Sequence, residues 1–218
     1  MPSRQIEPML AEKVVRIGTK KPGVERYSAI IQAAEAIITE ERSIEGLSIQ
    51  SVARRARIPR VSVYYFFPSV NSLLETLYER GVQRMATEFL GEPQSETTQL
   101  WPNFVESLMD QTRSHYEKNP VTMILALSPT SLTSLNQAHQ HYGKELAHTL
   151  AHLTGGRGSQ QLVRSCEIAS EIADCVWRKS VVEHQIILPS FHRQAKSAVI
   201  SYLKSVIREV FFDQVSAV

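Results

Sequence analysis

The chain has 218 residues, a formal net charge of +2 at pH 7 and two cysteines, and 43% of its residues are hydrophobic. This length allows a small domain together with a larger one. No stretch approaches the roughly 18 consecutive apolar residues of a membrane span, and the first residues lack the apolar core of a signal peptide, so we expect a cytoplasmic protein without a membrane partner.

Residues 1–23 are predicted to form a basic N-terminal arm. They contain five lysines and arginines, and three prolines and two glycines interrupt any long helix. Isoleucines and alanines then recur at helical spacing over residues 24–41, which predicts a first helix with one buried face. That face consists of Ile30, Ala33, Ala34, Ile37 and Ile38.

A second helix is predicted to begin at Ile49. Ser48 has the hydroxyl of an N-cap, and Leu47 and Val52 are spaced as a hydrophobic staple across it. An apolar stripe at helical spacing follows, made of Ile49, Val52, Ala53 and Ala56.

A turn follows at Arg57 and Ile58, and Pro59 lacks the amide hydrogen that a first-turn residue does not need. The spacing predicts a third helix from about Arg60 to Phe66. Its inward residues should be Val63, Phe67 and part of Tyr64. Two short helices joined by a tight turn are the skeleton of a helix-turn-helix DNA reader.

The stretch from Ser48 to Leu74 resembles, without a gap, the N-terminal domain of the TetR family of transcriptional regulators. A hydroxyl residue opens the second helix, an apolar pair with alanines follows, and hydroxyl, aliphatic and tyrosine residues precede a phenylalanine; these are Ser48, Ile49, Val52, Ala53, Ala56, Ile58, Ser62, Val63, Tyr64 and Phe67. The chain departs from the family pattern at the turn glycine, the capping serine, the glycine near the bases and the phosphate-binding lysine, where it has Arg57, Pro59, Val61 and Val70.

The resemblance implies a homodimer that reads a palindromic operator in double-stranded DNA. The residues that we expect to contact DNA are Ser48, Ser51, Arg55, Arg60 and Tyr64 on the backbone, and Arg60, Val61, Ser62 and Tyr65 nearest the base edges. Residues 1–84 carry 13 Lys and Arg against 9 Asp and Glu, so the positive charge lies with this domain. The basic arm either has no role or reaches the minor groove, as homeodomain arms do.

From Ser69 onward the pattern predicts only helices. The first begins at the N-cap Ser69, and the predicted ranges are about 69–90, 103–118, 120–127, 130–153, 159–186 and 189–212. The resemblance implies that residues 85–218 form a helical bundle for dimerisation and for a small, mainly apolar effector. Candidate ligand-binding residues are the large side chains Trp101, Phe104, Met109, Met123 and Trp177.

The last two helices are the predicted dimer interface. Residues 159–186 are apolar over an unusually wide arc, so this helix must bury two faces. Small residues permit close helix packing, and the candidates are Ala169, Ala173, Ala195 and Ala198, together with Tyr202. Cys166 and Cys175 lie on opposite faces of the predicted helix, and we expect both to be reduced and buried.

His141, Glu145, His148 and His152 form one strip at helical spacing. The strip is interpreted as a solvated polar face, with a zinc site as the alternative. There is no phosphate-binding loop, dinucleotide fingerprint or nucleophile elbow, so we predict neither an enzyme nor a cofactor.

The sequence therefore predicts an all-α transcriptional regulator, with a three-helix reader domain at 24–84 and a helical body at 85–218, that acts as a repressor released by its effector. The alternatives are a helical ligand-binding or scaffold protein whose helix-turn-helix has lost DNA recognition, and a metal sensor.

Overall fold

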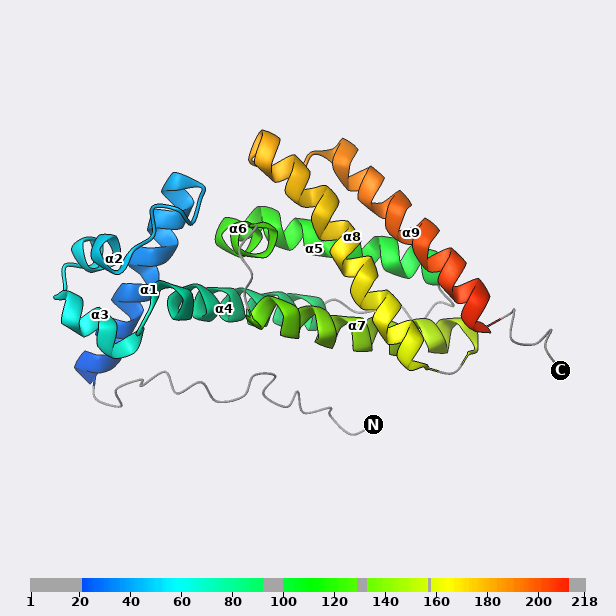
Figure 1. Cartoon of the computed structure of the whole chain (residues 1–218), viewed down its shortest axis with the longest axis horizontal. Coiled ribbons are helices and arrows are strands. Elements are labelled where there is room, and N and C mark those ends of the chain that lie inside the picture. Colours follow the sequence, from blue (N-terminus) through cyan, green and yellow to red (C-terminus); the bar gives the residue numbers. More distant parts are fainter. Residues whose placement is uncertain (1–20, 92–99, 129–132, 157, 212–218) are drawn as a thin grey trace. The chain divides into compact units, whose positions relative to one another are not determined.

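The computed structural model describes residues 21–91, 100–128, 133–156 and 158–211. Within these ranges the chain forms nine α-helices and no strand, which confirms the all-α prediction (Figure 1). It divides into two compact units, the first ending at Thr76 and the second beginning at Leu77. This division and the boundary predicted at residue 84 both fall inside one helix, α4 (Val70–Gly91). Nearly all of the predicted basic arm lies outside the described residues.

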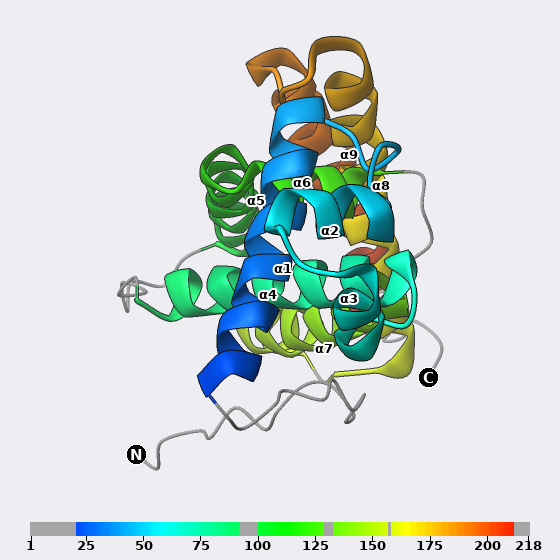
Figure 2. The same cartoon turned by 90° about the vertical axis from the view of Figure 1, so that its left-hand side faces the viewer.

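The first unit contains α1 (Lys21–Glu41), α2 (Ile49–Ala56) and α3 (Arg60–Phe66). α1 packs against both of the shorter helices (Figure 2). All five predicted core residues of α1 are buried, and Val52 of α2 and Val63 of α3 are fully enclosed. The amphipathic pattern therefore located this core correctly.

The inward face of α3 differs from the prediction at two positions, Phe66 and Tyr64. Phe66 is buried together with Val63 and Phe67, whereas Tyr64 is 53% exposed. Residues 63, 66 and 67 are three and four positions apart and share a helical face, while residue 64 lies about 100° away from residue 63. The ring of Tyr27 on α1 covers both phenylalanines, with centroid distances of 6.0 Å to Phe66 and 5.5 Å to Phe67.

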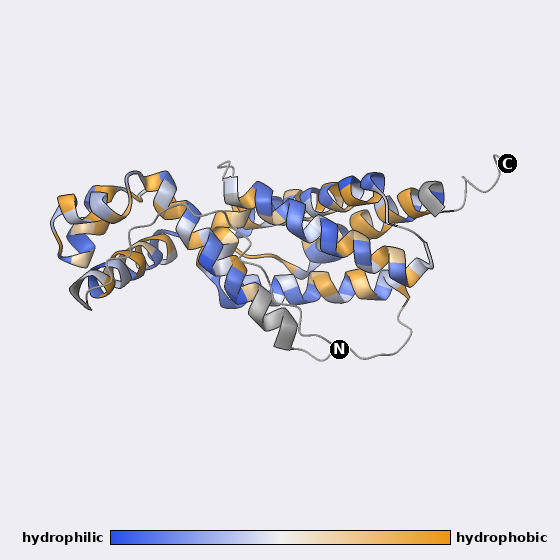
Figure 3. Ribbon diagram, turned by 90° about the horizontal axis from the view of Figure 1, so that it is seen from below, coloured by the Kyte–Doolittle hydropathy of each residue, from blue (hydrophilic) through white to orange (hydrophobic). Residues whose placement is uncertain are grey.

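The second unit contains the rest of α4 and five further helices. These are α5 (Trp101–Lys118), α6 (Pro120–Leu127), α7 (Thr133–Thr154), α8 (Gln160–His184) and α9 (Pro189–Phe211). α8 contacts α6, α7 and α9, and every residue of α6 after its first is buried. Hydrophobic and hydrophilic residues alternate around the helices of both units (Figure 3). No described helix is both long and apolar enough to cross a lipid bilayer.

α8 and α9 form an antiparallel hairpin (Figure 1). The buried hydroxyl of Ser180 closes the connection, because it donates a hydrogen bond to the Ile186 carbonyl at 2.8 Å and accepts one from the Leu188 amide at 2.9 Å. At the other edge of α8, a Cβ on Gly143 of α7 would lie 3.1 Å from the backbone nitrogen of Glu167. The small residues of these helices thus serve close packing within one chain.

This packing corrects part of the predicted dimer interface. Ala169, Ala173 and Ala195 are 2%, 6% and 0% exposed within a single chain, so a second copy has no access to them. Helical spacing identifies a face that packs closely but does not distinguish a helix of the same chain from one of a partner. Ala198 and Tyr202 are half-buried and keep a free surface.

The cysteine prediction is right for one residue and wrong for the other. Both thiols are free and Cys166 is buried, but Cys175 is exposed. Cys175 lies on the second apolar face of α8, and no described helix covers that face.

Candidate nucleic-acid interface and effector region

The start of α2 is fixed by two reciprocal hydrogen bonds. The Ser48 hydroxyl accepts one from the Ser51 amide at 3.0 Å, and the Ser51 hydroxyl accepts one from the Ser48 amide at 2.9 Å. This is a capping box with serine in place of the usual glutamate. Both predicted phosphate ligands therefore have a structural role in α2 already.

The turn after α2 keeps its left-handed geometry without a glycine. Arg57 has φ 56° and ψ 41°, and its amide and that of Ile58 donate hydrogen bonds back to α2. A residue with a Cβ in this region costs about 1 kcal/mol more than glycine. In place of the usual glycine, Arg57 thus introduces backbone strain and places an exposed guanidinium just before α3.

α3 presents four exposed side chains: Arg60, Val61, Tyr64 and Tyr65. Val61 is 80% exposed, and Tyr64 and Tyr65 are 53% and 55% exposed. Positions 61, 64 and 65 are three and four residues apart, so these side chains share one helical face. Ser62 is half-buried at the side of this face. The structure thus displays the predicted base-reading residues, with Tyr64 more exposed than expected.

Arg55, a predicted phosphate ligand, is already paired in this structure. Its guanidinium donates two hydrogen bonds of 2.5 Å to the two carboxylate oxygens of Glu40 on α1. These hydrogen bonds hold the pKa of Glu40 below its ordinary value. Contact between Arg55 and DNA would require this pair to open or to share its charge, whereas Arg54, Arg57 and Arg60 are simply exposed.

The predicted effector residues divide into two groups in the second unit. Met109, Met123 and Trp177 are buried, while Trp101 and Phe104 are half-buried. The Trp177 ring stacks on His192 at 5.7 Å and meets Tyr116 edge-on at 6.0 Å, so its orientation is fixed. Trp177 therefore belongs to an aromatic cluster that links α5, α8 and α9.

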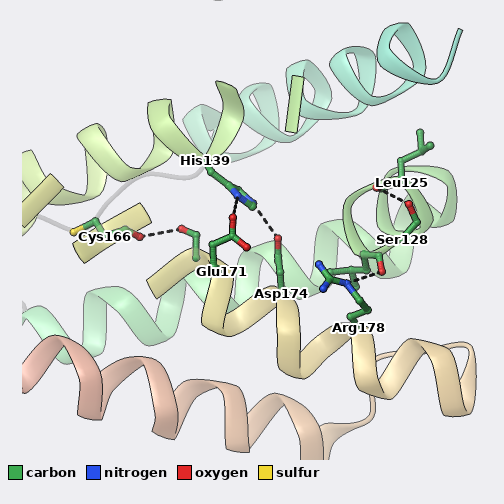
Figure 4. Close-up of polar contacts among 9 residues, drawn as sticks. Leu125, Ser128, His139, Cys166, Glu171, Asp174 and Arg178 are labelled. Atoms are coloured by element: carbon green, nitrogen blue, oxygen red, sulfur yellow. Dashed lines mark hydrogen bonds and ion pairs between the residues drawn. The ribbon is translucent and has the colours of Figure 1, made fainter. Parts of the chain in front are cut away.

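A charged group that the sequence did not predict joins α7 to α8 (Figure 4). His139 on α7 has its Nδ1 atom 3.1 Å from Glu171 Oε1 and its Nε2 atom 3.0 Å from Asp174 Oδ2, both on α8. Burial opposes protonation of the ring, but the hydrogen bonds and charges of the two carboxylates outweigh it and raise the pKa of His139. Burial also raises the pKa of Asp174. We place the shared proton on His139, because two carboxylate oxygens face the ring.

Several buried polar atoms of the same unit have no hydrogen-bond partner among the described residues. They include Thr122 Oγ1, Tyr142 Oη and Trp177 Nε1. Each of the three can donate a hydrogen bond, and leaving such a donor unsatisfied in an apolar core costs roughly 1 to 3 kcal/mol. A bound molecule with acceptor oxygens, or ordered water, would satisfy them.

The histidine strip has the form of a solvated surface. Glu145, His148 and His152 are exposed and His141 is half-buried. Among the residues that the structure describes, no group of three or more His, Cys, Asp or Glu side chains is arranged to hold a metal ion. The strip therefore offers no support for the metal-sensor alternative.

Comparison with known proteins confirms the resemblance to TetR-family regulators. No family model matches the chain. It is 31% identical over 102 residues to the HTH-type transcriptional regulator EthR of Mycobacterium tuberculosis and to that of Mycobacterium bovis, covering 44% of this chain and 47% of theirs. The chain thus spans about half the length of these curated relatives.

Two solved structures share the fold over most of the chain. A TetR-family transcriptional regulator from Streptomyces coelicolor has a TM-score of 0.61 at 23% identity and covers 83% of this chain and 99% of its own. A TetR transcriptional regulator from Rhodococcus sp. RHA1 has a TM-score of 0.59 at 16% identity and covers 84% of this chain and 98% of its own. The predicted combination of an N-terminal helix-turn-helix and a helical C-terminal unit is therefore the observed fold.

Proposed function

We propose that this chain, whose fold is that of TetR-family transcriptional regulators, is a sequence-specific DNA-binding regulator that reads duplex DNA with α3. The exposed face of α3 carries the proposal. Arg60, Val61 and the two tyrosines project from a short helix whose opposite face is buried, and no acidic residue occurs between positions 48 and 74. Arg54 and Arg57 supply further positive charge beside this face.

A binding titration against salt tests this function. Fluorescence anisotropy with the DNA upstream of the protein's own gene should give a dissociation constant that rises steeply with salt, because each phosphate contact releases counterions. With six or more phosphate contacts, affinity should fall on the order of a thousandfold between roughly 50 and 200 mM salt. Arg60→Ala should weaken binding by roughly 1 to 3 kcal/mol if the guanidinium reads a guanine.

Arg193→Ala is the matched control, because it removes one exposed arginine from α9. It should leave DNA affinity unchanged. A salt-independent affinity, or equal losses for the two arginine variants, favours the alternative of a helical binding or scaffold protein without DNA recognition.

We propose that the uncovered face of α8 forms the homodimer interface. Ile168 and Val182 are 41% and 68% exposed, and Cys175 lies between them at a spacing of seven residues. Ile186, in the connection just after α8, is a further large apolar side chain that is 49% exposed. Such a stripe of large apolar side chains on one helix face is typical of a protein interface. Ala198 and Tyr202 of the earlier prediction can extend it from α9.

Sedimentation velocity of Val182→Arg tests this interface. A charge at this exposed position of the stripe should oppose its burial in a dimer, and so give monomers that fold normally. These monomers should bind a palindromic operator poorly, because one monomer reaches only one half-site. Glu145→Arg, on the exposed surface of α7, is the matched control and should remain dimeric.

We propose further that the protein is a repressor, and that a small, mainly apolar effector with hydrogen-bond acceptors binds in the helical body near Trp177. Three buried donors that have no partner among the described residues support this, because acceptor atoms of a ligand would satisfy them: Thr122 Oγ1, Tyr142 Oη and Trp177 Nε1. Trp101→Phe leaves Trp177 as the reporter of binding, because the chain has two tryptophans. An effector that weakens operator binding about a hundredfold must bind the DNA complex about a hundredfold less tightly, and equal affinities with and without DNA would refute effector release.

A further inference from the structure

We propose that Val61 reads the 5-methyl group of a thymine in the major groove, which makes this thymine a required base of each operator half-site. The inference rests on the proposed DNA-binding function and adds a specificity determinant to it. Its starting observation is the exposure of Val61, which at 80% is higher than that of any other large hydrophobic side chain described in the structure.

The position of Val61 suits a contact with the base edge. It is the second residue of α3 and shares a face with Tyr64 and Tyr65. The Tyr65 ring packs edge-on against the buried Phe66 ring, with a centroid distance of 5.1 Å. The exposed face of α3 is therefore packed directly on the core. The two methyl groups of Val61 therefore project from a helix whose other face is packed in the core.

Neither folding nor helix propensity explains valine at this position. An exposed Val61 buries little apolar surface, and valine is a weaker helix former than alanine. Valine does have a rigid χ1 angle in helices, so its methyl groups lose little freedom when they are buried against a ligand. A contact outside the chain is the reason that fits the exposure.

The remaining side chains of α3 narrow the choice of base. Residues 60–66 contain no Asn or Gln for a bidentate contact with adenine and no Asp or Glu for the amino group of cytosine. Arg60 can read guanine, and Ser62 contacts bases without strong preference. In the major groove, thymine alone of the four bases offers a methyl group, and an apolar side chain is its matching partner.

The charges around the patch favour DNA over a protein as the occupant. Arg54, Arg57 and Arg60 are exposed on the two short helices, and the stretch 48–74 has no carboxylate. A purely apolar partner would leave these guanidinium groups without counter-charges, whereas phosphates beside the groove would pair with them. An apolar side chain surrounded by arginines is therefore suited to contact a base edge while the arginines contact the flanking phosphates.

Deoxyuridine substitution gives a sharp test, because uracil differs from thymine only by the missing methyl group. The best operator is first selected from random duplexes with the full-length protein, and each thymine is then replaced in turn by uracil. Replacing the contacted thymine in one half-site should lower wild-type affinity about fourfold, which corresponds to burial of one methyl group at about 0.8 kcal/mol. Substitution in both half-sites should cost about fifteenfold.

Val61→Ala completes a double-mutant cycle. The variant should bind the thymine operator more weakly than the wild type and should lose most of the preference over the uracil operator, because the two γ-methyl groups of valine are gone. Since position 61 is exposed, the variant should fold normally, and circular dichroism checks this. Val24→Ala, which shortens another exposed valine in the same unit, should keep the full uracil penalty.

The outcomes separate the inference from the function on which it rests. Strong, salt-dependent binding in which no uracil position distinguishes the wild type from Val61→Ala overturns the inference and leaves DNA binding intact. Failure to select any DNA overturns both, and Val61 would then belong to a protein-binding surface.

Discussion

Removing the imidazole of His139 should strongly destabilise the helical body. Asp174 has a side chain that is only 9% exposed, and His139 Nε2, 3.0 Å away, supplies its positive partner. In His139→Leu the Asp174 carboxylate stays buried without this partner, which costs roughly 3 to 5 kcal/mol. Glu171 adds little to this figure, because its carboxylate is 59% exposed and remains hydrated.

The assay is urea unfolding at pH 7, followed by tryptophan fluorescence, with a double-mutant cycle. His139→Leu combined with Asp174→Leu replaces both partners by apolar groups and should recover most of the loss. His148→Leu, an exposed histidine on the same helix, should change stability by no more than about 0.5 kcal/mol. If the double variant is less stable than His139→Leu alone, the buried pair is not the source of the stability.

The same pair predicts the pH dependence. Because the folded-state pKa of His139 is raised, its stabilisation is fully present below the unfolded pKa of about 6.5 and is lost as the pH rises through the folded pKa. His192 does not mask this loss above the unfolded pKa, because burial lowers the pKa of His192 and its ring is already neutral there. The loss should be absent from the variant that lacks both His139 and Asp174, and a wild-type slope equal to that of the variant would contradict the assignment.

Three further predictions concern the packing and the turn. Arg57→Gly should raise the free energy of unfolding of the first unit by about 1 kcal/mol, because it removes the strain of a Cβ in the left-handed backbone conformation. Arg57→Ala should not raise it, and urea unfolding followed by circular dichroism measures both. Ala195→Glu should unfold the helical body instead of giving folded monomers, because the site is fully enclosed, and analytical ultracentrifugation should contrast it with the folded monomers of Val182→Arg. Ser48→Ala should cost about 1 kcal/mol through loss of the N-cap, and the thermal midpoint should fall while the salt dependence of DNA binding stays the same.

The candidate interface could be predicted from sequence in its elements but only partly in its contacts. Arg60, Val61 and Tyr65 were correctly placed on the exposed face of α3, because helical spacing of apolar residues indicates which side is buried, whereas Tyr64 was predicted to be partly inward and is exposed. The ion pair of Arg55 with Glu40 joins residues 15 positions apart on different helices, so it cannot be predicted from a local sequence pattern. The same holds for His139, whose partners lie 32 and 35 positions further along the chain.

The sequence by itself determined the helices and their caps. Ser48 and Ser69 begin helices through hydrogen bonds to the residue three positions later, and Arg57 ends one through the conformation of its own backbone. These interactions act within one turn, so a few neighbouring residues carry all the information that they need.

Only the tertiary structure decided what each apolar face contacts. Ala195 and Val182 both lie on apolar helix faces, yet the first is fully buried in the chain and the second is 68% exposed. Helical periodicity gives the direction of a side chain about its own axis, but burial depends on which other helix comes within about 10 Å. That choice is made by the packing of the whole unit, which is why the interior of the chain and its free surface became distinct only in the folded structure.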